Sequence, residues 1–177
     1  MLIGNRALFG IEYEFLPGTS AGGSWMFGKC CYWIGGRMVG DYDLGTSLRD
    51  VLVSYPHIVG DNGTRQCPSL CGSSAAYVCD VLDGILYRGD IARDDIRFIE
   101  AAARFSIEPK VDVFSKVSVY CLGCDITARL IARQVDEATI REFRTPLSLV
   151  ETTISTFYAL LDAAYENARS REISDEQ

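Results

Sequence analysis

This chain of 177 residues contains one histidine, no long apolar run and no excess of positive charge. The single histidine, His57, leaves general acid–base catalysis with few groups that accept a proton near neutral pH. No segment approaches the ~20 consecutive apolar residues that a membrane-spanning helix needs. The amino-terminal residues also lack the basic and apolar stretches of a signal peptide. We therefore expect no membrane segment and no export, and place the protein in the cytoplasm.

Positive charge is outnumbered, since 17 lysines and arginines stand against 24 aspartates and glutamates, for a net charge of −7. Proteins that grip nucleic-acid phosphates through their own surface show the opposite sign, so direct nucleic-acid binding is disfavoured. An acidic surface suits a basic protein partner, because complementary fields speed the encounter. The same charge can also serve solubility alone.

Apolar residues make up 48% of the chain and charged residues 23%, a composition typical of soluble globular proteins. A chain of this length can bury an ordinary core as one domain without support from metals or disulfides. We expect this domain to span residues 1–169. The acidic segment 170–177 has no apolar stripe, and we expect it to be a frayed tail.

Cysteine, by contrast, is present in seven copies. An odd number in a chain without an export signal argues against a complete disulfide framework and favours reduced, structural thiols. One alternative is a zinc-stapled adaptor, because the sequence offers four candidate ligands in two closely spaced pairs: Cys67, Cys71, Cys121 and Cys124. Another is a small thiol enzyme in which one cysteine works with His57. The favoured interpretation includes no cofactor and no metal.

A β-hairpin is predicted in the first third of the chain. Residues 9–15 alternate between apolar and polar, as in a strand with one wet face. Residues 25–34 are apolar at nearly every position, as in a central strand covered on both faces. Gly35 and Gly36 then favour a two-residue turn, because primed turns need positive φ angles.

This turn sets the register of the hairpin, in which five pairs are predicted: Ile34–Arg37, Trp33–Met38, Tyr32–Val39, Cys31–Gly40 and Cys30–Asp41. Cys30 and Cys31 then point to opposite faces of the sheet, so they cannot act together as a chelate or a dithiol.

Three residues that could suggest chemistry, Asp41, Tyr42 and Asp43, lie where the hairpin gives way to a helix. Apolar residues at helical spacing run from Leu48 to Tyr55, Ser47 is placed to cap the helix, and Pro56 is expected to end it near Tyr55. Acidic residues ahead of a helix amino terminus are favourable without any catalytic role. We therefore interpret this stretch as structure and not as an active site.

The second half of the chain predicts helices around a further hairpin. A helix should start at Ser73 or Ser74, with Ala75, Cys79, Leu82 and Leu86 inward. A shorter one should lie within residues 91–105, with Ile96, Ile99 and Ala103 inward. Residues 116–124 and 126–135 read as two strands joined near Gly123.

The last element is a long amphipathic helix, with Thr145 as its cap and Pro146 in its first turn. Its apolar residues recur by threes and fours: Leu147, Val150, Ile154, Phe157, Leu161, Ala164 and Ala168. The whole pattern predicts an α+β fold, with an antiparallel sheet of about five or six strands packed against several helices.

Three stretches of this sequence resemble a known family: "FGIEYEF" near the start, "WMFGKCCYWIGGRMVGDYDLGTSLRDVL" in the first half, and "VDVF" at residues 111–114. The family is immunity protein family forty-two of bacterial polymorphic toxin and contact-dependent inhibition systems. The resemblance implies a cytoplasmic, non-enzymatic protein that binds and neutralises one cognate toxin. Such toxins are commonly nucleases, so the implied partner is a basic toxin domain.

Carboxylates of the first strand and of the helix start are the candidate toxin-binding residues. If these segments converge, they form an acidic patch bordered by aromatic side chains, which are common interface anchors. The predicted set is Glu12, Glu14, Trp25, Asp41, Tyr42 and Asp43, and the acidic helices around Asp80, Asp83, Asp94 and Asp95 are the alternative.

Overall fold

The computed structural model describes residues 1–16, 26–89, 102–134 and 139–175. It confirms the α+β class, but divides the strands between two antiparallel sheets. The five-stranded sheet consists of β1 (Leu2–Gly4), β2 (Phe9–Phe15), β3 (Phe27–Ile34), β4 (Arg37–Val39) and the short β5 (Thr46–Ser47), which also pairs with β3. The three-stranded sheet consists of β6 (Val117–Cys124), β7 (Thr127–Gln134) and β8 (Ile140–Pro146).

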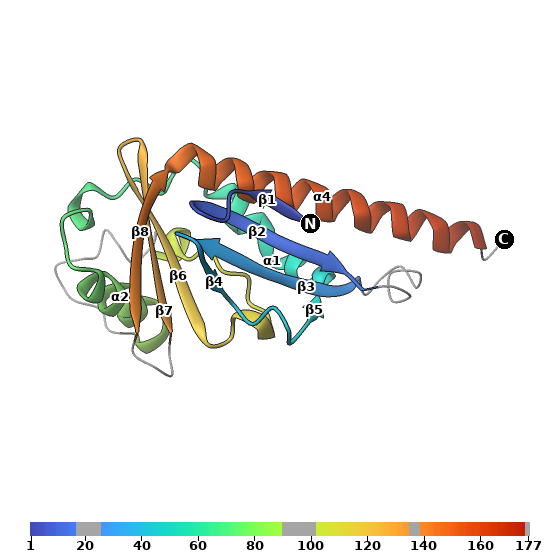
Figure 1. Cartoon of the computed structure of the whole chain (residues 1–177), viewed down its shortest axis with the longest axis horizontal. Helices are drawn as coiled ribbons and strands as arrows, with labels where there is room; N and C mark the ends of the chain where they lie inside the picture. Colours follow the sequence, from blue (N-terminus) through green and yellow to red (C-terminus); the bar gives the residue numbers. More distant parts are fainter. Residues whose placement is uncertain (17–25, 90–101, 135–138, 176–177) are drawn as a thin grey trace.

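The helices are α1 (Leu48–Gly60), α2 (Ala75–Asp83), which continues as the π-helical segment η3 (Gly84–Arg88), and α4 (Leu147–Asp175). Short 3₁₀ turns complete the chain: η2 (Pro68–Leu70), η4 (Ala102–Phe105) and η5 (Asp112–Phe114). In Figure 1, α1 and α4 lie behind the five-stranded sheet, while α2 lies beside the three-stranded sheet. No described helix combines the length and apolar character needed to cross a membrane.

The predicted register of the first hairpin is confirmed for the three pairs nearest the turn. The predicted pairs Cys31–Gly40 and Cys30–Asp41 are wrong, because β4 ends at Val39 and the Asp41 amide donates to the Val113 carbonyl at 2.8 Å. Strand β3 pairs with β4 through Ile34–Arg37, Trp33–Met38 and Tyr32–Val39. The turn between them has φ angles of +56° at Gly35 and +77° at Gly36, which only glycine adopts without strain.

Helix α1 starts where predicted but ends later. The hydroxyl of Ser47 accepts a hydrogen bond from the Asp50 amide at 3.2 Å, as expected of a cap. The prediction that Pro56 ends the helix is wrong, because the helix continues to Gly60. Tyr55 and Ile58 are both fully buried. Their packing offsets the one helical hydrogen bond that Pro56 cannot donate.

The three-stranded sheet is covered on both faces. Val119, Cys121 and Leu130 belong to the main core, which the sheet shares with α1, α4 and the five-stranded sheet. Tyr120 and Ile131 point to the other face, into a smaller cluster with α2 and the 3₁₀ turns. Because the sheet has a core on each face, its strands are apolar at successive positions.

The turn between β6 and β7 lies at Asp125 and Ile126, two residues later than predicted. Asp125 adopts a φ of +60°, a conformation that aspartate tolerates better than most residues. Gly123 instead sits within β6, where an added Cβ would come within 3.1 Å of the Arg65 carbonyl oxygen. Close approach of two backbones, and not a turn, explains this glycine.

The predicted start of α2 is confirmed, while two other helix predictions need correction. Ser74 is the cap of α2, and its hydroxyl accepts from the Tyr77 amide at 3.2 Å. Ile96 and Ile99 lie outside the described residues, and Ala103 is exposed while its neighbour Ala102 is buried. Thr145 belongs to β8 and its buried hydroxyl has no hydrogen-bond partner within the described chain, so it does not cap α4.

Helix α4 confirms the predicted stripe. Leu147, Val150, Ile154, Phe157 and Leu161 are buried in the main core. Beyond them Ala164 is only partly buried, and the helix extends past the body of the protein in Figure 1. It remains helical to Asp175, further than the boundary at residue 169 that we expected.

Candidate functional site

One face of the five-stranded sheet bears polar and aromatic side chains. The helices that contact this sheet, α1 and α4, pack against its opposite face through Phe9, Ile11, Tyr13 and Tyr32. Because strand residues alternate, the remaining side chains point away from these helices. We call this surface the outer sheet face, and define it by Glu12, Glu14, Phe27, Lys29, Cys31, Trp33 and Met38.

Glu12 is the centre of one cluster on the outer sheet face. Its carboxylate accepts a hydrogen bond from Arg6 at 2.6 Å and another from the Trp33 indole Nε1 at 2.7 Å. The Arg6 guanidinium also lies over the Trp33 ring, 5.0 Å from its centroid. These three side chains hold one another in place and bring an arginine, a carboxylate and an aromatic ring to one spot.

A second cluster joins the loop after β4 to the same face. The Tyr42 hydroxyl donates to Glu14 at 3.5 Å, and the Lys29 ammonium lies 5.5 Å from the centre of the Tyr42 ring. Lys29 also approaches the exposed Asp43 carboxylate at 3.5 Å. Partial burial and then the Glu14 carboxylate raise the pKa of Tyr42 to about 12, so its hydroxyl stays protonated and can donate.

The structure thus brings Glu12, Glu14, Tyr42 and Asp43 to one region, and Tyr42 is half-buried there. Asp41 has a structural task, because its carboxylate accepts the Asp43 and Leu44 amides at 3.2 Å each and shapes the loop.

Trp25, the remaining predicted residue, lies outside the described residues. The sequence did not lead us to predict Lys29, Trp33 or Arg6 as residues of this site. Lys29 lies opposite Glu14 on the neighbouring strand, a contact that follows only once the register of β2 against β3 is known.

The buried thiols do not form a catalytic site in the described chain. Burial raises the pKa of Cys30, Cys31 and Cys121 to about 12, which keeps them protonated and poorly nucleophilic. At Cys31 the Glu12 carboxylate adds to this rise, while Arg6 lowers it. His57 is exposed on α1, and no contact joins it to a described cysteine.

Two of the cysteines considered as zinc ligands are bonded to each other. Cys71 and Cys124 form a disulfide with a Cα–Cα distance of 5.8 Å, whereas Cys67 and Cys121 are free and buried. The expectation that all seven cysteines are reduced is therefore wrong for this pair. A disulfide sulfur lacks the thiolate charge that binds zinc. The described residues hold no cluster of three or more potential metal ligands.

Comparisons with known proteins show the family and the fold of this chain. The family model of immunity protein 42 matches residues 1–172, nearly the whole chain. This chain belongs to the immunity protein 42 family. The crystal structure of CdiI from Burkholderia dolosa shares the fold, with a TM-score of 0.70 at 16% sequence identity, over 90% of this chain and 99% of that one. The search of curated proteins finds no match.

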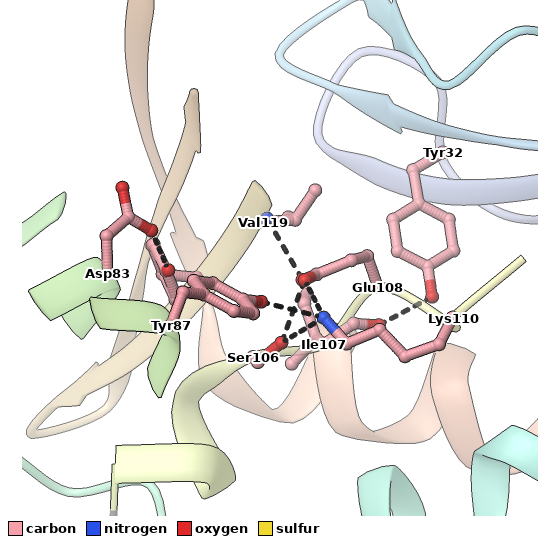
Figure 2. A network of polar contacts seen from close by, with 9 residues as sticks. Tyr32, Asp83, Tyr87, Ser106, Ile107, Glu108, Lys110 and Val119 are labelled. Atoms are coloured by element: carbon pink, nitrogen blue, oxygen red, sulfur yellow. Dashed lines mark hydrogen bonds and ion pairs between the residues drawn. The ribbon is translucent and has the colours of Figure 1, made fainter. Parts of the chain in front are cut away.

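In this immunity protein a third polar cluster lies between α2 and the three-stranded sheet, and Figure 2 shows it from close by. The buried Glu108 carboxylate accepts from Ser106 at 2.9 Å, from Lys110 at 2.6 Å and from the Val119 amide at 3.0 Å. Burial disfavours the charged Lys110 ammonium, but the neighbouring Glu108 carboxylate outweighs this and raises its pKa. The carboxylate of Glu108 is thus satisfied internally.

Asp83 is similarly occupied in the immunity protein. One of its oxygens accepts from the Tyr120 hydroxyl and the other pairs with Arg133 at 2.8 Å. Arg133 also reaches Asp80 at 3.0 Å. Asp94 and Asp95, the other acidic residues of the alternative surface, lie outside the described residues. The described part of this alternative surface therefore stabilises the packing of α2 and presents little unpaired charge.

Proposed function

We propose that this family member neutralises a cognate toxin by binding it through the outer sheet face and the adjoining loop at Asp41–Asp43. The observation that supports the proposal most is the meeting of Glu12, Glu14 and Asp43 with Trp33 and Tyr42 on a face that α1 and α4 leave open. Aromatic anchors surrounded by charge are typical of tight protein–protein interfaces.

The partner we propose is a basic toxin domain with nuclease activity, delivered between bacteria by contact-dependent inhibition. The net charge of −7 supports a basic partner. The shared fold with CdiI from Burkholderia dolosa supports the delivery route. The immunity protein would act in the cytoplasm, without catalysis of its own, by covering a surface that the toxin needs.

The first prediction concerns complex formation. Co-expressed with the toxin domain encoded beside it, the protein should form a stable one-to-one complex and restore growth. Nuclease–immunity pairs reach dissociation constants of ~10⁻¹³ to 10⁻¹⁶ M, so we expect nanomolar affinity or better. Isothermal titration and size-exclusion chromatography with light scattering are the measurements. Absence of binding at micromolar concentrations would refute the proposed function.

The second prediction locates the interface. Glu14→Lys combined with Asp43→Lys should slow association with the toxin at low salt and weaken its salt dependence, because exposed rim charges act mainly on encounter. Tyr42→Ala should instead speed dissociation, because it removes an anchor. Asp41 is left intact, since it holds the loop. Stopped-flow fluorescence or surface plasmon resonance measures both rates.

The matched control for the charge reversal is Asp162→Lys with Glu166→Lys, two exposed residues on α4, the helix that packs behind the opposite face. This control should leave the association rate close to that of the wild type. Equal association rates for the two double variants at low salt, with both folds intact by circular dichroism, would place the interface elsewhere.

A further inference from the structure

A cleft lies between the edge strand β4 and the three-stranded sheet. It comprises two adjoining hollows of about 460 and 490 Å³, which share Val39, Ala132, Thr139 and Arg141 among their lining residues. Val39 and Ala132 are apolar and nearly buried, and make the floor. Arg141 pairs with Ala132 across β7 and β8, so its side chain leaves the sheet on the cleft side.

The second hollow has a local charge opposite to that of the whole protein, whereas the first is lined by Asp41 and Asp112 as well as Lys116 and Arg141. Arg37, from β4, and Arg141, from β8, both line the second hollow. Neither guanidinium group makes an ion pair or a hydrogen bond within the described part of the chain. The carboxylate in the same hollow, Glu142, is already held by Arg129 at 2.7 Å. Within the described residues, two arginine side chains without ion-pair partners thus share the second hollow with one occupied carboxylate.

The edge of β4 also offers backbone groups. In a two-residue hairpin the pair next to the turn, Ile34–Arg37, is hydrogen-bonded, so the next pair, Trp33–Met38, is not. The amide and the carbonyl of Met38 therefore point away from β3. No described backbone group bonds either of them. Met38 lines the first hollow as well as belonging to the outer sheet face, so the cleft is continuous with the proposed interface.

We infer that this cleft binds an extended, acidic segment of the toxin, an inference that rests on the proposed function. A carboxylate of that segment would lie between Arg37 and Arg141, since guanidinium groups bind carboxylates through paired hydrogen bonds. The backbone of the segment would accept from the Met38 amide and donate to its carbonyl. The toxin would then bind the acidic outer sheet face with a basic surface and the arginines of the cleft with an acidic segment. Two contacts of opposite charge fix the orientation of the toxin on the immunity protein.

A synthetic peptide tests the cleft independently of the toxin. Acetyl-Val-Glu-Val-Glu-Val-amide, titrated into the isotope-labelled full chain, should give saturable amide shifts at Arg37, Met38, Val39, Ala132 and Arg141 in NMR spectra. The matched peptide with lysine in place of glutamate should not. The inference is overturned if both peptides cause the same shifts, or if the acidic peptide shifts residues outside the cleft.

Binding of the toxin domain to cleft variants tests whether the toxin occupies the cleft. Arg37→Glu and Arg141→Glu, each alone, should raise the dissociation constant of the complex at least about tenfold. Arg169→Glu, an exposed reversal on α4, should not change it. Arg37→Gln and Arg141→Gln replace either variant that fails to fold. If the wild type binds and the cleft variants bind equally well, the inference fails and the proposed function stands. If the wild type does not bind, the proposed function fails and the toxin is excluded as occupant.

Discussion

Leu161→Asp is expected to unfold the domain at neutral pH. Leu161 is fully buried in the main core, on the stripe of α4 that packs toward α1 and the five-stranded sheet. The substitution removes a buried leucine side chain, worth roughly 2–5 kcal/mol, and adds a carboxylate without a partner. Single domains are stable by only about 5–15 kcal/mol, so little folded protein should remain. Circular dichroism during thermal melting is the measurement.

The neighbouring residue supplies the control. Leu160 is 40% exposed on the same helix, so Leu160→Asp should melt close to the wild type. Deletion of residues 170–177 should also be nearly silent, because the buried stripe ends well before them. A cooperative melt unchanged by Leu161→Asp would mean that α4 does not hold the core together, and that its stripe serves a partner.

Loss of the disulfide is expected to have the second largest effect. Cys71 and Cys124 are 53 residues apart in the sequence, so their bond removes much conformational freedom from the unfolded chain. Loop-closure entropy puts the stabilisation at about 4 kcal/mol, taken as an upper value. Cys71→Ser with Cys124→Ser should therefore lower the melting temperature by up to roughly 8–16 °C.

The fold itself should survive this change. Backbone hydrogen bonds still join the two segments, from the Cys67 amide to the Gly123 carbonyl at 2.9 Å and from the Gly123 amide to the Arg65 carbonyl at 2.7 Å. Reduction of the wild type by a phosphine should reproduce the melting temperature of the double variant, and the reductant should not affect the variant. Identical melting of oxidised and reduced wild type would show that the bond contributes no stability.

Local features of the sequence were enough to predict several elements. The Gly35–Gly36 turn determined the register of β3 and β4, because so few residues adopt positive φ angles. The cap at Ser47 and the stripe from Leu147 to Leu161 could be predicted for a similar reason, since both depend on residues three or four positions apart. The apolar stripe of α4 could be predicted from the residues of that helix alone.

Other features depend on contacts between distant segments, and only the tertiary structure decided them. Burial of Tyr55 and Ile58 carries α1 past Pro56, against the local preference of proline. The loop at residues 65–71 packs on β6 through backbone hydrogen bonds of Arg65 and Cys67 with Gly123, and this contact brings Cys71 to Cys124.

The sequence by itself determined the first hairpin turn, the starts of α1 and α2 and the acidic charge, because these depend on near neighbours and on composition. The tertiary structure alone decided that the strands form two sheets, and that Glu14 meets Lys29 and Tyr42. It also placed Arg37 and Arg141 in one cleft. Each of these juxtapositions depends on how strands far apart in the chain pair and pack, and local backbone preferences do not encode that choice.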